Sequence, residues 1–149
     1  MGIPIRKILV PIDFSEVSSL AVRYASSLAG AFGAELAIMT VADDDSEWVV
    51  DLSDRMQVRE RWREERLREG ERKLNSFCMP LLGDVSVSFE VRVGDSTEEI
   101  VDACSRLEVD LLILGAHGTT GVVSDWLGGT AYGVSKRAPC PVLMVKTGS

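Results

Sequence analysis

Five short apolar segments alternate with helical patterns along the chain, and this alternation restricts the possible folds more than any other feature of the sequence. The apolar segments are Lys7–Asp13, Glu35–Val41, Val85–Val93, Val109–Leu114 and Pro141–Lys146. Four of them have the length and composition of buried β-strands, whereas Val85–Val93 has apolar residues at alternate positions, the pattern of a strand with one buried face and one wetter face. Strands that alternate with helices form a parallel sheet with both faces covered, because right-handed crossover helices join parallel neighbours. The sequence therefore predicts an α/β fold with a doubly wound five-stranded sheet.

Three of the intervening stretches carry clear helix signals. Ser15 is a candidate N-cap, and apolar residues from Val17 to Phe32 recur at helical spacing. Ser96 and Glu99 form an S-x-x-E pattern that predicts a capping box at the start of a further helix. A last helix is expected over about 128–137.

The stretch from about Ser53 to Leu74 is rich in arginine and glutamate at helical spacings. A solvated amphipathic helix is the ordinary interpretation of this pattern. A partner-binding helix is the functional alternative.

Size, charge and cysteine content exclude several protein classes. The chain has 149 residues, which suits one domain over residues 1–149, and its formal net charge of −7 disfavours nucleic acid as a partner. No apolar stretch approaches the roughly 20 residues needed to cross a bilayer, so no membrane association is expected. The three cysteines form no C-x-x-C pair, which favours a reducing cytoplasm.

Two features are expected at the same edge of the sheet. Asp13 ends the first predicted strand, and Gly115-Ala116-His117-Gly118 follows the fourth. Ligands of open parallel sheets bind outside the carboxyl ends of the strands, at the point where the strand order reverses. We therefore expect these residues to border a binding crevice.

The glycines continue as Gly115-x2-Gly118-x9-Gly128, followed by Gly129 and Thr130. Glycines at these places permit close backbone approach, and exposed amides of such a loop can bind phosphate oxygens. Neither a Walker motif nor a G-x-G-x-x-G fingerprint is present. Taken alone, glycines after a strand also fit an ordinary turn.

This glycine spacing resembles the G-x2-G-x9-G-[S/T] signature of ATP-binding universal stress proteins. The similarity extends to KILVPIDFSE, GAELAIMTV, VGDSTEEIVD, DLLILGAHGTTG and APCPVLMVK, in order and over nearly the whole chain. The resemblance implies strand order 3-2-1-4-5, an ATP site between the first and fourth strands, and frequent homodimers.

The resemblance also implies a set of nucleotide-binding residues. Those expected at the adenine and ribose end are Pro11, Ile12, Asp13 and Val41; those expected around the ribose and phosphates are Gly115, Ala116, His117, Gly118, Gly128, Gly129 and Thr130. One departure from the signature is Gly129, which stands where the family usually has Ser or Thr. We expect weaker phosphate binding as a result, with the Thr130 hydroxyl as a substitute.

The sequence offers little for catalysis. His117 is the only histidine, and no nearby feature supplies a nucleophile and an orienting partner for it. Asp13 could assist a bound Mg²⁺, although one carboxylate is weak evidence for a metal site. The first hypothesis is thus a regulatory ATP-binding module, with or without Mg²⁺ and at most a weak ATPase.

Two other functions remain open. The first is a stress-protein relative that binds no nucleotide and acts through protein contacts alone, which Gly129 makes plausible. The second is a phosphoacceptor receiver domain, which would need further acidic residues around Asp13.

The fifth predicted strand raises the question of a partner. Val142–Val145 is continuously apolar and would form an exposed sheet edge in a monomer. This edge and the resemblance both favour a homodimer joined through it, while the identity of any other protein partner stays unknown.

Overall fold

The computed structural model describes residues 2–43, 55–116 and 129–147. The elements follow one another as β1 (Lys7–Pro11), α1 (Glu16–Phe32), β2 (Glu35–Ala42), α2 (Arg55–Cys78), the 3₁₀ turn η2 (Met79–Leu81), β3 (Val87–Val93), α3 (Ser96–Arg106), β4 (Leu111–Ala116), α4 (Gly129–Arg137) and β5 (Val142–Lys146). The five strands form one parallel sheet in the order β3-β2-β1-β4-β5. The predicted fold class and strand order are confirmed.

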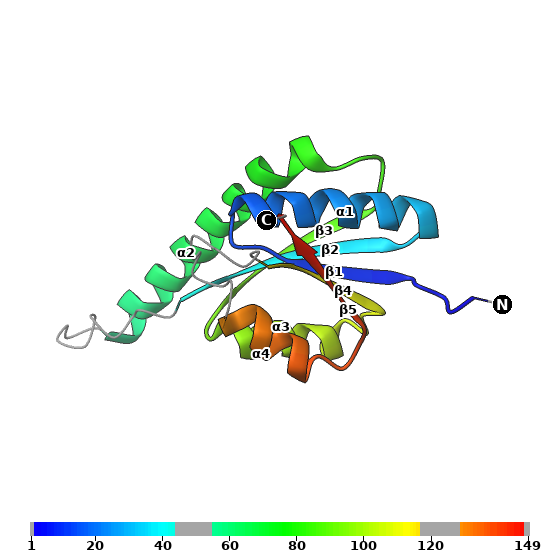
Figure 1. Cartoon of the computed structure of the whole chain (residues 1–149). Helices are drawn as coiled ribbons and strands as arrows, with labels where there is room; N and C mark the ends of the chain where they lie inside the picture. Colours follow the sequence, from blue (N-terminus) through cyan, green and yellow to red (C-terminus); the bar gives the residue numbers. More distant parts are fainter. Residues whose placement is uncertain (1, 44–54, 117–128, 148–149) are drawn as a thin grey trace.

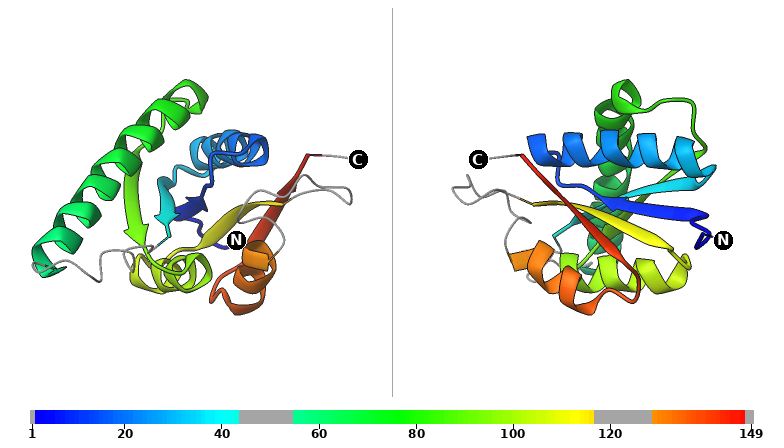
Figure 2. Two further views of the ribbon diagram at one scale, coloured as in Figure 1. Left: turned by 90° about the vertical axis from the view of Figure 1, so that its left-hand side faces the viewer. Right: turned by 45° about the vertical axis from the view of Figure 1, so that its right-hand side comes forward.

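Helices cover both faces of the sheet. Figures 1 and 2 show α1 and α2 on one face and α3 and α4 on the other. The α1 and α2 face buries Ile8, Val10, Ile38 and Ile113, while the opposite face buries Leu9, Met39, Leu112 and Leu114. Because successive strand residues point to opposite faces, the continuous apolar runs of the central strands supply both cores.

Local signals explain where α1 begins and ends. The Ser15 hydroxyl accepts a hydrogen bond from the Ser18 N–H, and Gly33 closes the helix with a left-handed φ of 67°. The apolar stripe is narrower than its sequence spacing predicts, since Tyr24 and Phe32 are about half exposed.

The charged helix α2 covers the edge strand β3. It packs close to that strand at Gly70, where an added Cβ would lie only 2.7 Å from Cγ1 of Val91. Its ion pairs Glu64–Arg68 and Glu69–Lys73 lie on the exposed surface, as the solvated-helix interpretation predicts. Among the helices of the described ranges, none is both long and apolar enough to span a bilayer.

Candidate functional site

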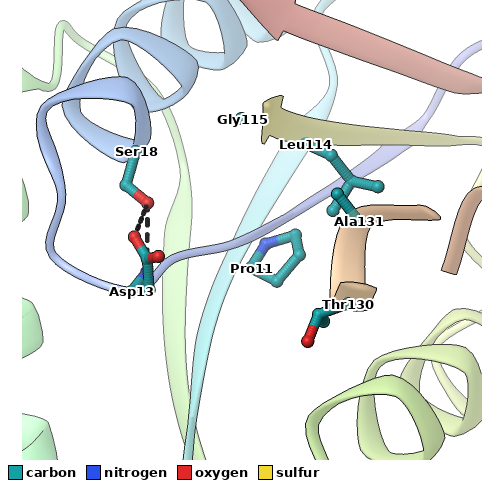
Figure 3. Close-up of a pocket in the computed structure, with 7 residues that line it drawn as sticks. All are labelled: Pro11, Asp13, Ser18, Leu114, Gly115, Thr130 and Ala131. Carbon is teal, nitrogen blue, oxygen red and sulfur yellow. Dashed lines mark hydrogen bonds between the residues drawn. The ribbon is translucent and has the colours of Figure 1, made fainter. Parts of the chain in front are cut away.

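The candidate site lies where the strand order switches, at the carboxyl ends of β1 and β4. A pocket at this edge is lined by Pro11, Asp13, Ser18, Leu114, Gly115, Thr130 and Ala131. Figure 3 shows Asp13 and Ser18 on one side of the pocket and Thr130 and Ala131 on the other, with Pro11 between them. Segments more than 100 residues apart in sequence thus meet at one place.

Asp13 is fixed by the turn that leads from β1 into α1. Its Oδ1 accepts hydrogen bonds from the Ser15 N–H (3.1 Å), the Ser15 hydroxyl (2.5 Å) and the Ser18 hydroxyl (2.7 Å). The Asp13 N–H donates to Oγ of Ser18 at 3.0 Å. Phe14, with a left-handed φ of 67°, continues the turn, and its ring packs edge-on against Phe77 of α2. The carboxylate is therefore presented to the pocket in one orientation.

Gly115 allows β4 to approach the first turn of α1. A Cβ at this position would lie 3.0 Å from the carbonyl oxygen of Val17 and 3.1 Å from its Cγ1. Strand β4 continues through Gly115 and Ala116, although the sequence placed both in the loop after the strand. The prediction of the strand end was wrong because the pairing of Gly115 with Val145 and of Ala116 with Lys146 of β5 extends the strand.

The opposite wall of the pocket comes from the first turn of α4. Among the residues that the structure describes, no heavy atom lies within 4 Å of a Cβ added at Gly129, so the described part of the chain leaves open space at this point. The Thr130 hydroxyl, which was expected to replace the hydroxyl missing at position 129, already has a partner. It lies 2.9 Å from the Ser96 hydroxyl of α3.

The structure corrects the capping box predicted for α3. The N-cap is Asp95, whose Oδ2 accepts the Glu98 N–H at 3.0 Å. Glu99 instead accepts a hydrogen bond from Nε of Arg92 at 3.0 Å. The prediction placed the cap one residue too late, because both Asp95 and Ser96 are good capping residues and local sequence does not choose between them.

The pocket contains four of the expected nucleotide-binding residues, Pro11, Asp13, Gly115 and Thr130. Ile12 and Val41 are buried nearby, and both main-chain polar groups of Ile12 are engaged: its N–H donates to Met39 and its C=O accepts the Thr40 hydroxyl. Ala116 is buried at the end of β4, and Gly129 is exposed at the start of α4. His117, Gly118 and Gly128 lie outside the described residues.

Sequence reasoning missed Ser18, Leu114 and Ala131. Ser18 could have been found, since it lies three residues after the N-cap Ser15 and helical geometry brings that position next to the cap. Leu114 and Ala131 are ordinary apolar residues without a distinguishing signal. They line the pocket only because of how β4 and α4 are placed.

The described lining residues offer the hydroxyls of Ser18 and Thr130 and the carboxylate of Asp13 as polar side-chain groups. None of the seven lining side chains is cationic, and within ranges 2–43, 55–116 and 129–147 no three His, Cys, Asp or Glu side chains gather to hold a metal ion. Cys104 is buried in the α3 and α4 core, and this burial raises the pKa of its thiol to about 12. The protonated thiol is a poor nucleophile at neutral pH.

Known proteins similar to this chain match it over nearly its full length. The model of the universal stress protein family matches residues 4–146. The universal stress protein MJ0531 of Methanocaldococcus jannaschii is 30% identical, with 95% of this chain and 82% of the relative covered. The universal stress protein YxiE of Bacillus subtilis is also 30% identical, with 94% and 98% covered.

Solved structures share the fold. That of MJ0577, from the same archaeon as MJ0531, has a TM-score of 0.71 and 26% identity, with 97% of each chain covered. A universal stress protein of Archaeoglobus fulgidus in complex with dAMP has a TM-score of 0.64 at 16% identity, with 97% of this chain and 100% of that chain covered.

Proposed function

Because this chain belongs to the universal stress protein family, we propose that it is a single-domain regulatory protein that binds an adenine nucleotide, ATP in the first instance, in the crevice between β1 and β4. The observation that supports this most is the joining of Asp13, Gly115 and Thr130 around one pocket at the switch point of the sheet. In the same family, one solved structure holds cAMP and another dAMP.

The proposed roles follow from the two sides of the pocket. Pro11 and Asp13, with Ile12 and Val41 behind them, would hold the adenine and ribose. Gly115, Ala116, Gly129 and Thr130 would border the phosphates together with the sequence-predicted His117, Gly118 and Gly128. Since no lining side chain in the described ranges is cationic, main-chain amides and an accompanying Mg²⁺ would have to balance the phosphate charge.

A thermal-unfolding series tests the nucleotide proposal. ATP with Mg²⁺ at one hundred times its Kd is expected to add roughly 2.7 kcal/mol, which raises Tm by about 5 °C or more. GTP should give a smaller shift if the adenine is recognised, and Mg²⁺ without nucleotide serves as the control. Mass analysis of nucleotide retained through purification would identify the physiological ligand directly.

A nucleotide-free adaptor is the second candidate, because Gly129 lacks a side chain and the Thr130 hydroxyl is paired with Ser96. The absence of a Tm shift with ATP, ADP and AMP would support this second candidate. In either case we propose a cytoplasmic protein with at most slow hydrolysis, since the described lining residues include no histidine to act as a base at neutral pH and no cation to stabilise charge developing on the phosphates.

We further propose a homodimer joined along β5. This strand is an edge of the described sheet, and Leu143 on it is 36% exposed. Pairing with a second copy would satisfy the outer main-chain groups of Val142–Lys146 and bury this apolar surface.

Replacing Leu143 by glutamate is expected to weaken the dimer by on the order of 100-fold in Kd, because pairing would bury an unpartnered carboxylate. Analytical ultracentrifugation would measure the change. Met79→Glu is the matched control, since Met79 is exposed near α2, which covers the opposite edge strand β3. A Leu143→Glu chain that dimerises like the wild type would place the interface elsewhere.

A further inference from the structure

Helix α4 needs support from other elements to hold its first turn. It has nine residues, two of which are Gly129 and Gly133. Glycine is less favourable than alanine within a helix, and isolated helices of this length are unstable in water. The position of Gly129 and Thr130 therefore depends on tertiary contacts.

The start of α3 supplies contacts to α4. The Ser96 hydroxyl forms a 2.9 Å hydrogen bond with the Thr130 hydroxyl. The next residue, Thr97, packs so close to Gly133 that an added Cβ there would lie 3.2 Å from Cγ2 of Thr97. Ala131 and Val134 on the inner side of α4 are buried in the core. Two successive residues of α3 thus fix the first half of α4.

The Ser96 hydroxyl is available for this bond because another residue caps the N-terminus of α3. Asp95 caps the helix, and Glu99 is engaged with Arg92. Arg106, at the other end of α3, reaches Glu90 of β3 at 2.6 Å, so both ends of the helix are tied to the sheet edge. Ser96 therefore links α3, which is anchored at both ends, to the first turn of α4, which needs outside support.

We infer that Ser96 is a positioning residue for the phosphate end of the nucleotide site, acting through its hydrogen bond to Thr130. The inference rests on the proposed function. The first amides of α4 lack partners within the helix and are the groups proposed to face phosphate. Without the bond, the turn that starts at Gly129 frays and those amides lose their alignment, while the Asp13 side of the pocket is unchanged.

Calorimetric titration with ATP and with adenosine tests this role. In Ser96→Ala, ATP affinity is expected to fall about three- to tenfold, as for the loss of one hydrogen bond, while adenosine affinity stays at the wild-type value. Ser96→Thr keeps a hydroxyl and should restore ATP affinity. The ratio of the two affinities is the readout, because general destabilisation would lower both together.

Thr130→Val removes the same hydrogen bond by deleting its other hydroxyl, which lies on α4. This variant also tests the inference if Ser96→Ala fails to fold. Either single variant and the double variant should lose the same ATP affinity, because the two hydroxyls act as one unit. Additive losses, or an unchanged ratio of ATP to adenosine affinity in the folded variants, would overturn the inference. A wild-type chain that binds adenosine as tightly as ATP would also overturn it while leaving adenine binding intact. One that binds neither ligand refutes the proposed function itself, and this inference with it.

Discussion

Replacement of Gly115 by valine is expected to destabilise the fold by about 3 kcal/mol and to remove nucleotide binding, because the added side chain overpacks a well-filled contact. Even a single Cβ would lie 3.0 Å from the carbonyl oxygen and 3.1 Å from the carbonyl carbon of Val17. These are backbone atoms in the first turn of α1 and cannot rotate away. The valine would push α1 from β4 and so displace Ser18 from the pocket.

Chemical denaturation of Gly115→Val and Gly115→Ala measures the effect, with the alanine variant expected to lose about 1 kcal/mol. Gly129→Ala is the matched control, since no heavy atom of the described ranges lies within 4 Å of a Cβ at that position. It should be neutral or slightly stabilising because alanine favours the helix. If both substitutions at Gly115 left the unfolding midpoint unchanged, the close approach of β4 to α1 would not be real.

Replacement of Gly118 by valine is expected to abolish the Tm shift given by ATP while leaving the fold intact. The residue belongs to the Gly115-x2-Gly118-x9-Gly128 spacing, in which main-chain amides are proposed to meet the phosphates directly. A branched side chain at such a glycine blocks close backbone approach. The whole roughly 2.7 kcal/mol expected at one hundred times Kd would then be lost.

The comparison is a thermal-unfolding scan of Gly118→Val with and without ATP and Mg²⁺. Val122→Ala, at a variable position between Gly118 and Gly128, is the control and should keep the shift. Equal Tm values for Gly118→Val and wild type without ligand would show that the fold tolerates the change. An ATP shift of wild-type size in Gly118→Val would mean that the phosphates bind elsewhere.

The fold could be predicted from sequence because its signals are local and repeated. The apolar run within the predicted strand Lys7–Asp13 is buried as expected, although β1 itself ends at Pro11 and leaves Asp13 just beyond it. The intervening helices fix the strands as parallel. The cap at Ser15 and the left-handed Gly33 are likewise set by single residues. Such features depend on one segment at a time.

The wrong predictions concern residues whose structural role depends on a neighbouring element. Strand β4 extends through Ala116 because β5 pairs with it, and Ser96 leaves the capping role because Asp95 takes it and Thr130 lies opposite. The exposure of Tyr24 and Phe32 likewise depends on which elements lie beside α1. Periodicity alone contains no information about such neighbours.

The sequence by itself determined the layered α/β architecture and the edge of the sheet at which Asp13 and Gly115 meet, since strand direction and order follow from alternation and family resemblance. Only the tertiary structure decided that Leu114 and Ala131 complete the pocket and that Ser96 holds Thr130. Such contacts join residues from different elements, whose distances arise from how helices pack on the sheet rather than from any pattern along the chain.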